Sequence, residues 1–310
     1  MSNDTNNNVL FSQYYAQWID VYKKGAIREA TMAKYLMTQR WVEKLVPELR
    51  VSELTRTVYQ QLLNDYAREH ERQTTLDFHH QLKGAILDAV DEGMIERDPT
   101  RKAIIKGKTP KAKKIKYLNQ FELHTLIADL DIKEEPNWDW FILLVAKTGM
   151  RFSEALAITP ADFDFEKQTV RINKTYHRMK RQDIITSPKT AKSNRIVVMP
   201  EFLCEEMQDY FQMYYSLAQD QRIFPFSKSY LKHEMERGCK ETGVPVIRIH
   251  DLRHSHVSLL IHMGFTALAI GNRVGHEAEK ITYRYAHLFP TVQTEMANKL
   301  DVERMEEDEI

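Results

Sequence analysis

Apolar positions in the first hundred residues recur at helical spacing. The first such stretch places Leu10, Tyr14 and Trp18 on one face and stops at Gly25, which favours the end of a helix. The same pattern predicts three more helices, over residues 29–46, 55–66 and 74–92. Short loops connect the four, so the N-terminal part of the chain is predicted to form a small helical bundle.

A different pattern begins after residue 117. Asn119, followed by Glu122, is typical of a capped helix start, and the apolar run "WDWFILLVAKTG" predicts a helix that ends at Gly149. β-Branched residues gather in "TVRINKTY", "DIITS" and "NRIVVMP", which predict a small antiparallel sheet edged by a basic hairpin. The pattern is helical again after Pro200. The fold class expected is mostly α with a small antiparallel β-sheet, in which a four-helix domain precedes an α-rich domain.

Charge is balanced over the whole chain but unevenly distributed along it. The sequence holds 44 Lys and Arg against 44 Asp and Glu, yet six of the acids lie in the last ten residues. Residues 101–116 carry eight bases and no acid, and residues 171–195 carry eight bases against Asp183 alone. One basic segment is usually a solvated stretch, but two of them favour contact with the phosphates of a nucleic acid.

Length and cysteine content bound the class of protein. A chain of 310 residues, 43% of them hydrophobic, can bury two cores, so two domains are expected. The two cysteines lie far apart, and the sequence shows neither a signal peptide nor an apolar run long enough to span a membrane. We therefore expect a soluble cytoplasmic protein without disulfides and without a membrane partner.

Two short motifs carry arginines that call for a partner. In "TGMRFSEAL", Arg151 follows the glycine that ends one helix and opens the next, and Glu154 lies three residues on. The two residues can form a purely structural ion pair, or Glu154 can hold the guanidinium for a ligand. In "HDLRHSH", His250 and Arg253 project from one face of a starting helix, where they favour an oxyanion or a phosphate.

The same histidine cluster raises a metal site as an alternative. His250, His254 and His256 could suggest zinc, but His256 lies on a different helical face from His250, and Arg253 would repel a cation. We therefore expect no metal, and we expect His254 and His256 to be packing or surface residues.

A nucleophile is suggested by the segment "RVGHEAEKITYRYAH", which supplies His276, Tyr283 and Tyr285. Two positions apart in a helix means about 200° of rotation, so at most one of the tyrosines can face a given pocket. Lys189, in "SPKTAKSNR", is expected at the tip of the basic hairpin. Two Arg, two His, one Lys and a Tyr, with neither a metal-ligand set nor a glycine-rich phosphate loop, indicate a metal-free phosphoryl-transfer site.

The ordered set "TGMRFSE", "SPKTAKSNR", "HDLRH", "VGH" and "YAH" resembles the tyrosine recombinase family. It looks most like phage and integrative-element integrases, and the resemblance covers about residues 9–290. It implies an N-terminal four-helix core-binding domain followed by an α-rich catalytic domain. It also implies that Arg151 and Arg253 clamp the phosphate and that Glu154 is their supporting carboxylate.

The remaining roles are implied position by position. Lys189 would be the general acid that protonates the leaving 5′ oxygen, His250 an acid/base next to the phosphate, and His276 the residue that orients it. The nucleophile of such proteins falls nine residues after the Gly-His histidine and begins a Tyr-x-His triplet, and Tyr285 meets both conditions. Tyr283 meets neither, and we expect it to be a packing or DNA-flanking residue.

The reaction implied is conservative DNA strand exchange without a metal or nucleotide cofactor. The tyrosine leaves a 3′-phosphotyrosine and a free 5′ hydroxyl, and the hydroxyl of a partner strand reverses the step. The partners implied are double-stranded DNA attachment sites, four copies of the protein on two duplexes, and accessory host or element factors that bend DNA or set directionality. Contacts to the DNA backbone are expected from the basic linker and hairpin, at Lys106, Lys108, Lys111, Lys113, Lys114, Lys116, Arg178, Lys180, Arg181, Lys192 and Arg195.

The expected domain organisation has five parts. They are a disordered N-terminus at 1–8, a helical core DNA-binding domain at 9–100, a basic interdomain linker at 101–117, a catalytic domain at 118–288 and a C-terminal tail at 289–310. The amphipathic tail is expected to dock on a neighbouring protomer, with packing on its own domain as the alternative. Integrases of this type usually carry a further N-terminal domain for arm sites. Either the protein acts on simple sites or that domain is missing from this chain.

Two other functions fit part of the same residue set. A type IB topoisomerase would share the Arg, Lys, His and Tyr residues but act as a monomer, which the C-terminal tail argues against. A catalytically silent DNA-binding regulator on the same scaffold would be expected to have lost one of the six residues, and all six are present.

Overall fold

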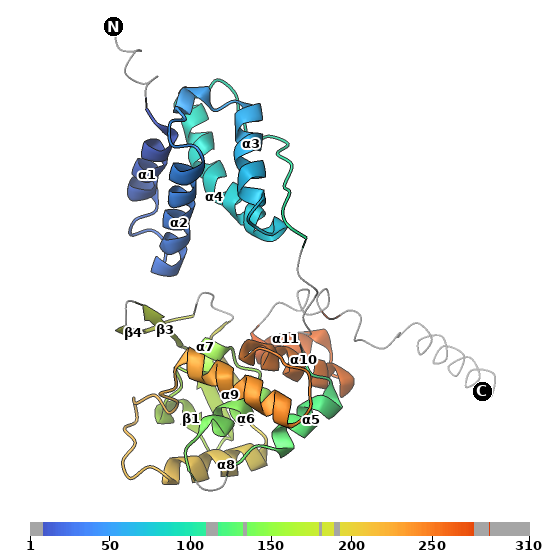
Figure 1. Cartoon of the computed structure of the whole chain (residues 1–310). Helices are drawn as coiled ribbons and strands as arrows, with labels where there is room; N and C mark the ends of the chain where they lie inside the picture. Colours follow the sequence, from blue (N-terminus) through green and yellow to red (C-terminus); the bar gives the residue numbers. More distant parts are fainter. Residues whose placement is uncertain are drawn as a thin grey trace, which may run out of the picture. The chain divides into compact units, whose positions relative to one another are not determined.

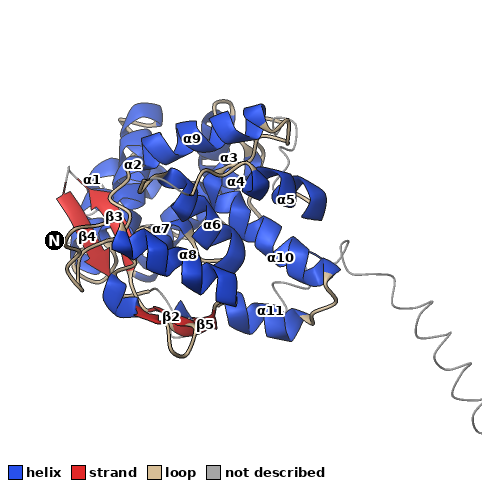
Figure 2. Cartoon of the chain, turned by 90° about the horizontal axis from the view of Figure 1, so that it is seen from below, coloured by secondary structure: helices blue, strands red, loops and turns tan. Residues whose placement is uncertain are grey.

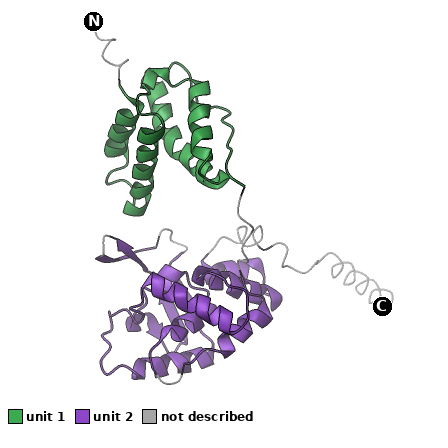
Figure 3. Cartoon of the chain, viewed as in Figure 1, with its two compact units in different colours: residues 1–113 green, residues 114–310 purple. Residues whose placement is uncertain are grey.

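The computed structural model describes residues 9–109, 117–132, 135–179, 182–188, 193–275 and 285. The chain divides into two compact units, residues 1–113 and 114–310, which Figure 3 shows in different colours. Each unit has its own buried apolar core. No helix in the described ranges is both long enough and apolar enough to cross a membrane.

The described part of the first unit is a bundle of four helices (Figure 1). The helices are α1 (Phe11–Tyr22), α2 (Glu29–Leu45), α3 (Arg56–Ala67) and α4 (Arg72–Asp91), with a 3-10 turn, η2, at Val51–Glu53. Gly25 lies beyond α1 in the left-handed conformation, with φ 78°, where a helix commonly stops. The Thr55 hydroxyl caps α3 by accepting the backbone N–H of Val58 at 3.3 Å. The helices that the apolar periodicity predicts are therefore present.

The basic segment that follows begins on the surface of the first unit. The Gln60 side chain of α3 donates to the carbonyl of Ile104 at 2.9 Å and accepts from the backbone N–H of Ile104 at 2.8 Å. The backbone N–H of Lys108 donates to the carbonyl of His70 at 2.8 Å. Gly107 passes so close to α4 that a Cβ there would lie 2.1 Å from the backbone nitrogen of Arg72, so no other residue fits. Residues 101–109, which the sequence analysis placed in the linker, are thus attached to the first unit.

The second unit is built around one apolar helix. α6 (Trp138–Thr148) is buried at every position except Lys147, and α10 (Leu252–His262) packs along it. Figure 2 shows the helices that surround these two. They are α5 (Gln120–Ala128), α7 (Phe152–Ala155), α8 (Glu201–Gln212), α9 (Lys228–Glu241) and α11 (Ala267–Val274), with 3-10 turns η3 (Pro160–Asp162) and η5 (Ile249–Asp251). The expected cap of Asn119 and Glu122 begins α5, and each side chain accepts the other residue's backbone N–H.

The strands of the second unit form two small antiparallel sheets, where the sequence predicts one sheet edged by the hairpin. One sheet has the order β1 (Phe163–Asp164), β2 (Thr169–Ile172), β5 (Arg195–Val198), and the other pairs β3 (Thr175–Met179) with β4 (Gln182–Thr186). The break falls at Lys174, whose ammonium turns inward to Asp162 at 2.7 Å. The fold class, mostly α with small antiparallel sheets, is confirmed.

The strand bounds bear on the expected place of Lys189. Met179 of β3 pairs with Gln182 of β4, so the hairpin closes between these two residues. Lys189 follows β4 in the sequence and precedes β5, so it is not one of the residues between β3 and β4. The residue itself lies outside the described ranges.

Candidate active site

Arg151 opens the site at the junction of α6 and α7. Gly149 ends α6 in the left-handed conformation, with φ 67°, and Arg151 two residues on is the N-cap of α7. One terminal nitrogen of the Arg151 guanidinium donates to Oε1 of Glu154 at 2.6 Å, and its backbone N–H donates to Oε2 at 2.8 Å. The Arg151–Glu154 contact that the motif predicts is therefore present.

Glu154 is a buried carboxylate shared by two arginines. Its second partner is Arg195 of β5, whose guanidinium lies 2.9 Å from Oε2. Burial alone would raise the pKa of Glu154, but the hydrogen bond and charge of Arg195, together with Arg151, lower it below its ordinary value. Glu154 is therefore ionised at neutral pH and fixes both guanidinium groups.

Arg195 is among the residues predicted to contact DNA, and its surroundings in this structure are unlike those of an exposed basic residue. Its side chain is only 6% exposed. Its guanidinium also donates to the carbonyls of Arg273 at 2.9 Å and Ser193 at 3.1 Å. β5 pairs with β2 at the edge of the core, and this pairing turns Arg195 inward toward Glu154.

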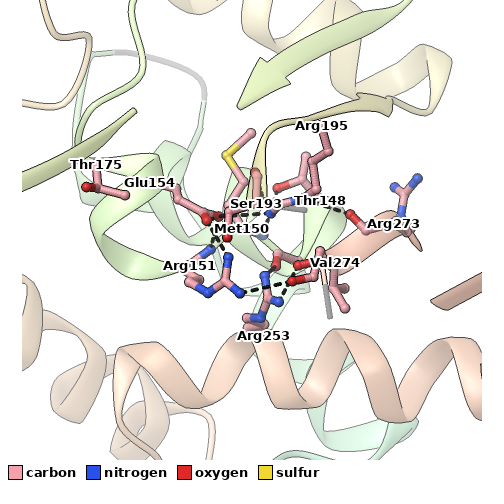
Figure 4. Close-up of polar contacts among 12 residues, drawn as sticks. Thr148, Met150, Arg151, Glu154, Thr175, Ser193, Arg195, Arg253, Arg273 and Val274 are labelled. Atoms are coloured by element: carbon pink, nitrogen blue, oxygen red, sulfur yellow. Dashed lines mark hydrogen bonds and ion pairs between the residues drawn. The ribbon is translucent and has the colours of Figure 1, made fainter. Parts of the chain in front are cut away.

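Arg253 rises from α10 and is 2% exposed (Figure 4). Its two terminal nitrogens donate to the carbonyls of Gly149, at 2.6 Å, and Val274. Burial, and then the nearby charges of Arg151 and Arg195, lower the pKa of Arg253 below its ordinary value. The guanidinium is still charged at neutral pH, because arginine is not deprotonated in proteins under such conditions.

Three arginines converge on the C-terminal end of α11. The consecutive carbonyls of Arg273, Val274 and Gly275 accept from Arg195, Arg253 and Arg151 respectively. The last carbonyls of a helix lack partners within it and carry partial negative charge, so they suit guanidinium donors. The end of α11 therefore sets the three guanidiniums side by side, as the dashed contacts in Figure 4 show.

The three arginines differ in how many N–H donors these contacts use. Arg195 uses four of its five donors on Glu154 and backbone carbonyls. Arg151 and Arg253 each use two in the contacts described above. Within the described ranges, Glu154 is the carboxylate paired with these arginines, and one negative charge compensates only one of their three positive charges. Arg151 and Arg253 are therefore the pair equipped to bind an anion, and Arg195 is the one that holds the site together.

His250 and His256 lie on either side of Arg253 in the sequence and have different environments. His250 is in η5 and reaches solvent, yet desolvation by the surrounding protein and the charge of Arg253 lower its pKa, which favours the neutral ring. His256 is buried, as a packing residue should be. Its Nδ1 donates to the Ala146 carbonyl at 2.8 Å, and its Nε2 accepts from Arg273 at 3.1 Å.

Of the two tyrosines in the C-terminal motif, Tyr285 is the one that lies within the described ranges. It is 3% exposed and packs against Val257, Ile261, Ile270 and Val274 of α10 and α11. Its hydroxyl is within hydrogen-bonding distance of Nδ1 of His254. Sequence reasoning missed this contact because it treated His254 only as a packing or surface residue. The signal was its spacing, since His254 follows Arg253 directly and lies one helical turn after His250.

Several predicted site residues lie outside the described ranges. They are His276, Tyr283 and Lys189, together with the basic residues Lys111, Lys113, Lys114, Lys116, Lys180, Arg181 and Lys192. Lys106 and Lys108 are exposed on the first unit, and Arg178 in β3 is 58% exposed. In the part of the chain that the structure describes, no three His, Cys, Asp or Glu side chains are grouped so that they could hold a metal ion.

The sequence of the second unit matches a known family. The model of the phage integrase family matches residues 116–291, which is more than half of the chain. The chain belongs to the phage integrase family. It is 31% identical to the ICEBs1 integrase of Bacillus subtilis over 227 residues, and 30% identical to the integrase of Staphylococcus phage L54a over 180 residues.

These matches cover only parts of the phage integrase relatives. The aligned region spans 69% of this chain and 61% of the ICEBs1 integrase, and 50% of this chain and 49% of the L54a integrase. The fold is shared more widely. The Tn1549 transposon integrase, solved with circular intermediate DNA, superposes with a TM-score of 0.77 at 17% identity and covers 96% of this chain and 99% of that one. A lambda integrase tetramer on a Holliday junction gives a TM-score of 0.66 at 14% identity, over 89% of this chain and 80% of that one.

Proposed function

We propose that this protein is a site-specific DNA recombinase that integrates or excises a mobile element. It cleaves and rejoins DNA strands through a 3′-phosphotyrosine formed on Tyr285. The observation that carries the proposal is the pair of guanidiniums, Arg151 and Arg253, held on adjacent carbonyls at the end of α11 with N–H donors that the described residues leave unused. Tyr285 packs on the two helices that hold this pair. Membership of the phage integrase family supports the same reaction.

Each step of the proposed reaction has a group to serve it. The hydroxyl of Tyr285 attacks the phosphodiester, and Arg151 and Arg253 neutralise the charge that builds up on the phosphate oxygens. His250, whose surroundings lower its pKa and favour the neutral ring, is the acid/base next to the phosphate. Lys189 protonates the leaving 5′ oxygen, and His276 orients the phosphate. The 5′ hydroxyl of a second strand then attacks the phosphotyrosine, so the bond energy is conserved without a nucleotide cofactor.

Glu154 and Arg195 have a supporting role in this scheme. Because Glu154 is buried between Arg151 and Arg195, it compensates one charge and leaves the clamp with a net positive charge for the phosphate. Arg195, with four of its donors already in use, positions the carboxylate and does not itself contact DNA.

The proposed partners are two DNA duplexes and three further copies of the chain. The lambda integrase has been solved as a tetramer on a Holliday junction, and its fold resembles this one. We extend that assembly to this protein, with residues 289–310 docking on a neighbouring copy. Deletion of this tail is expected to leave cleavage of a single site largely intact but to weaken synapsis of two sites, measured by native gel electrophoresis. Unchanged synapsis would contradict the docking.

A nicked suicide duplex that carries the attachment site of the element tests the reaction. The wild type should form a covalent protein–DNA band on a denaturing gel, Tyr285→Phe should lose it, and Tyr283→Phe should keep it. A band lost only in Tyr283→Phe would assign the nucleophile to the other tyrosine. No band from wild-type protein on a site that it binds would leave a silent DNA-binding regulator, and relaxation of supercoils by monomeric protein would favour a topoisomerase.

A further inference from the structure

α10 distributes its polar residues over different faces. Arg253 points to the carbonyls of Gly149 and Val274, and His256 points to Ala146 and Arg273. His254 lies between them in sequence, and one residue is about 100° of helical rotation. Its Nδ1 therefore meets the hydroxyl of Tyr285 and neither of these other sets of partners. The helix that supplies the clamp thus also presents an imidazole to the proposed nucleophile.

A second ring lies beside His254. His250 is four residues earlier, and the two ring centroids are 5.9 Å apart in an edge-to-face arrangement. The Tyr285 ring is also 5.9 Å from the His254 ring. His254 therefore stands between the proposed nucleophile and the residue proposed to contact the phosphate. Both of these neighbouring rings, His250 and Tyr285, are titratable, and the charged Arg253 precedes His254 in the helix.

We infer that His254 is the general base that accepts the proton of Tyr285 as this tyrosine attacks the phosphate. The inference rests on the proposed function. The O–H bond of Tyr285 breaks, its proton passes to Nδ1 of His254, and the phenolic oxygen forms the new bond to phosphorus. The bond from phosphorus to the 5′ oxygen breaks, and that oxygen takes its proton from the general acid, Lys189. In the rejoining step both protons return, so no co-reactant is needed.

The chemistry of the two side chains favours this assignment. A phenol ordinarily has a pKa near 10, so it is a poor nucleophile at neutral pH unless a base removes its proton. An imidazole has an ordinary pKa near 6.5, so at the pH of the cell most of it can accept a proton. A base in direct contact with the nucleophile typically contributes about 10²–10⁴-fold to the rate.

Single-turnover cleavage of the nicked suicide duplex by full-length variants tests this role. His254→Ala should cut at least about 100-fold more slowly than wild type while binding the same DNA, and added imidazole should restore part of the rate. His254→Gln, which can hydrogen-bond Tyr285 but cannot take up its proton, should be as slow as His254→Ala. His262→Ala, an exposed histidine on the same helix, is the matched control and should cut at the wild-type rate with or without imidazole.

A sulfur in place of the bridging 5′ oxygen separates the base from the acid. A thiolate leaves without needing a proton, so this substrate should restore cleavage by Lys189→Ala but not by His254→Ala. A wild-type rate in His254→Ala or His254→Gln, or restoration of His254→Ala by the sulfur substrate, would overturn the assignment. Loss of cleavage without any rescue by imidazole would overturn it as well. Failure of the wild type to form a covalent complex would instead contradict the proposed function itself.

Discussion

Strand β5 and the β3–β4 hairpin come from one basic run of sequence but use their arginines in opposite ways. Arg195 in β5 is buried, and four of its N–H donors bond Glu154 and backbone carbonyls. Arg178 in β3 is largely exposed, and its ion pair with Asp183 spans 3.7 Å. Positive charge in a sequence therefore predicts contact with DNA only where the donors of the cation stay available at the surface.

The contrast between buried Arg195 and exposed Arg178 would not hold if Arg195 could be replaced without loss of stability. Among the described residues, Arg195→Ala leaves the buried carboxylate of Glu154 with Arg151 as its remaining cation, and it removes the donor from two backbone carbonyls, those of Ser193 and Arg273. Loss of one partner of a buried ion pair usually costs about 3–5 kcal/mol. We expect a loss of about 3 kcal/mol in the free energy of unfolding, at the lower end because Arg151 still contacts Glu154. Urea denaturation measures it.

The matched control for this change is Arg178→Ala. A loss below about 0.5 kcal/mol in both variants would mean that Arg195 has no structural role. If Arg195→Ala instead had unchanged stability and a smaller salt dependence of DNA binding, Arg195 would be a residue that contacts DNA.

How much the sequence could predict depends on the range of the interactions involved. Local rules placed the Asn119–Glu122 cap, the end of α6 at Gly149 and the Arg151–Glu154 contact, because each needs residues only three or four positions apart. The convergence on α11 could not be predicted in the same way. It joins Arg253 to a carbonyl 21 residues away and Arg151 to one 124 residues away.

What the sequence did not show has the same cause. Whether Arg195 faces inward depends on its pairing with β2, and whether His254 contacts Tyr285 depends on where that tyrosine packs. Both are tertiary facts that charge and helical spacing do not contain. The ordered motifs did indicate the family. They name the residues that long-range packing brings together, although the packing itself cannot be derived from them.

Gly149 extends the comparison to the backbone beneath the buried arginines. Its φ is 67°, its carbonyl accepts from Arg253, and a Cβ there would lie 2.5 Å from Cδ2 of His256. Gly149→Ala should therefore lose about 2–3 kcal/mol in the free energy of unfolding, from left-handed strain and overpacking together. Gly243→Ala is the control, since that glycine has a similar φ of 73° and nothing within 4 Å of its Cβ position. Equal losses in thermal or urea unfolding would contradict a role for His256 packing.

His256 makes the buried region sensitive to acid. Burial, and then the charge of Arg273, lower its pKa to about 3 from an ordinary 6.5. The unfolded chain takes up a proton below pH 6.5, but the folded chain does not until about pH 3. Stability is therefore fully present above pH 6.5 and falls as the pH drops through this window, by about 1.4 kcal/mol per pH unit for this residue.

A variant without the titrating ring isolates this contribution. His256→Gln can still donate to Ala146 and accept from Arg273, and its free energy of unfolding should depend less steeply on pH between about pH 6 and pH 4.5. The exposed His262→Gln should keep the wild-type slope. Identical slopes in wild type and His256→Gln would show that His256 is protonated in the folded protein.

The smallest expected effect belongs to the exposed side of the comparison. Arg178→Ala should change the free energy of unfolding by less than about 0.5 kcal/mol, because Asp183 keeps its contact with Arg222 at 3.0 Å. If the hairpin contacts the DNA backbone, affinity should weaken by a similar factor for attachment-site and random duplexes, since a phosphate contact carries no sequence information. The slope of log affinity against log salt should fall by about 1. An unchanged slope would leave Arg178 a solvated surface residue, and exposure would then be necessary for DNA contact without being sufficient.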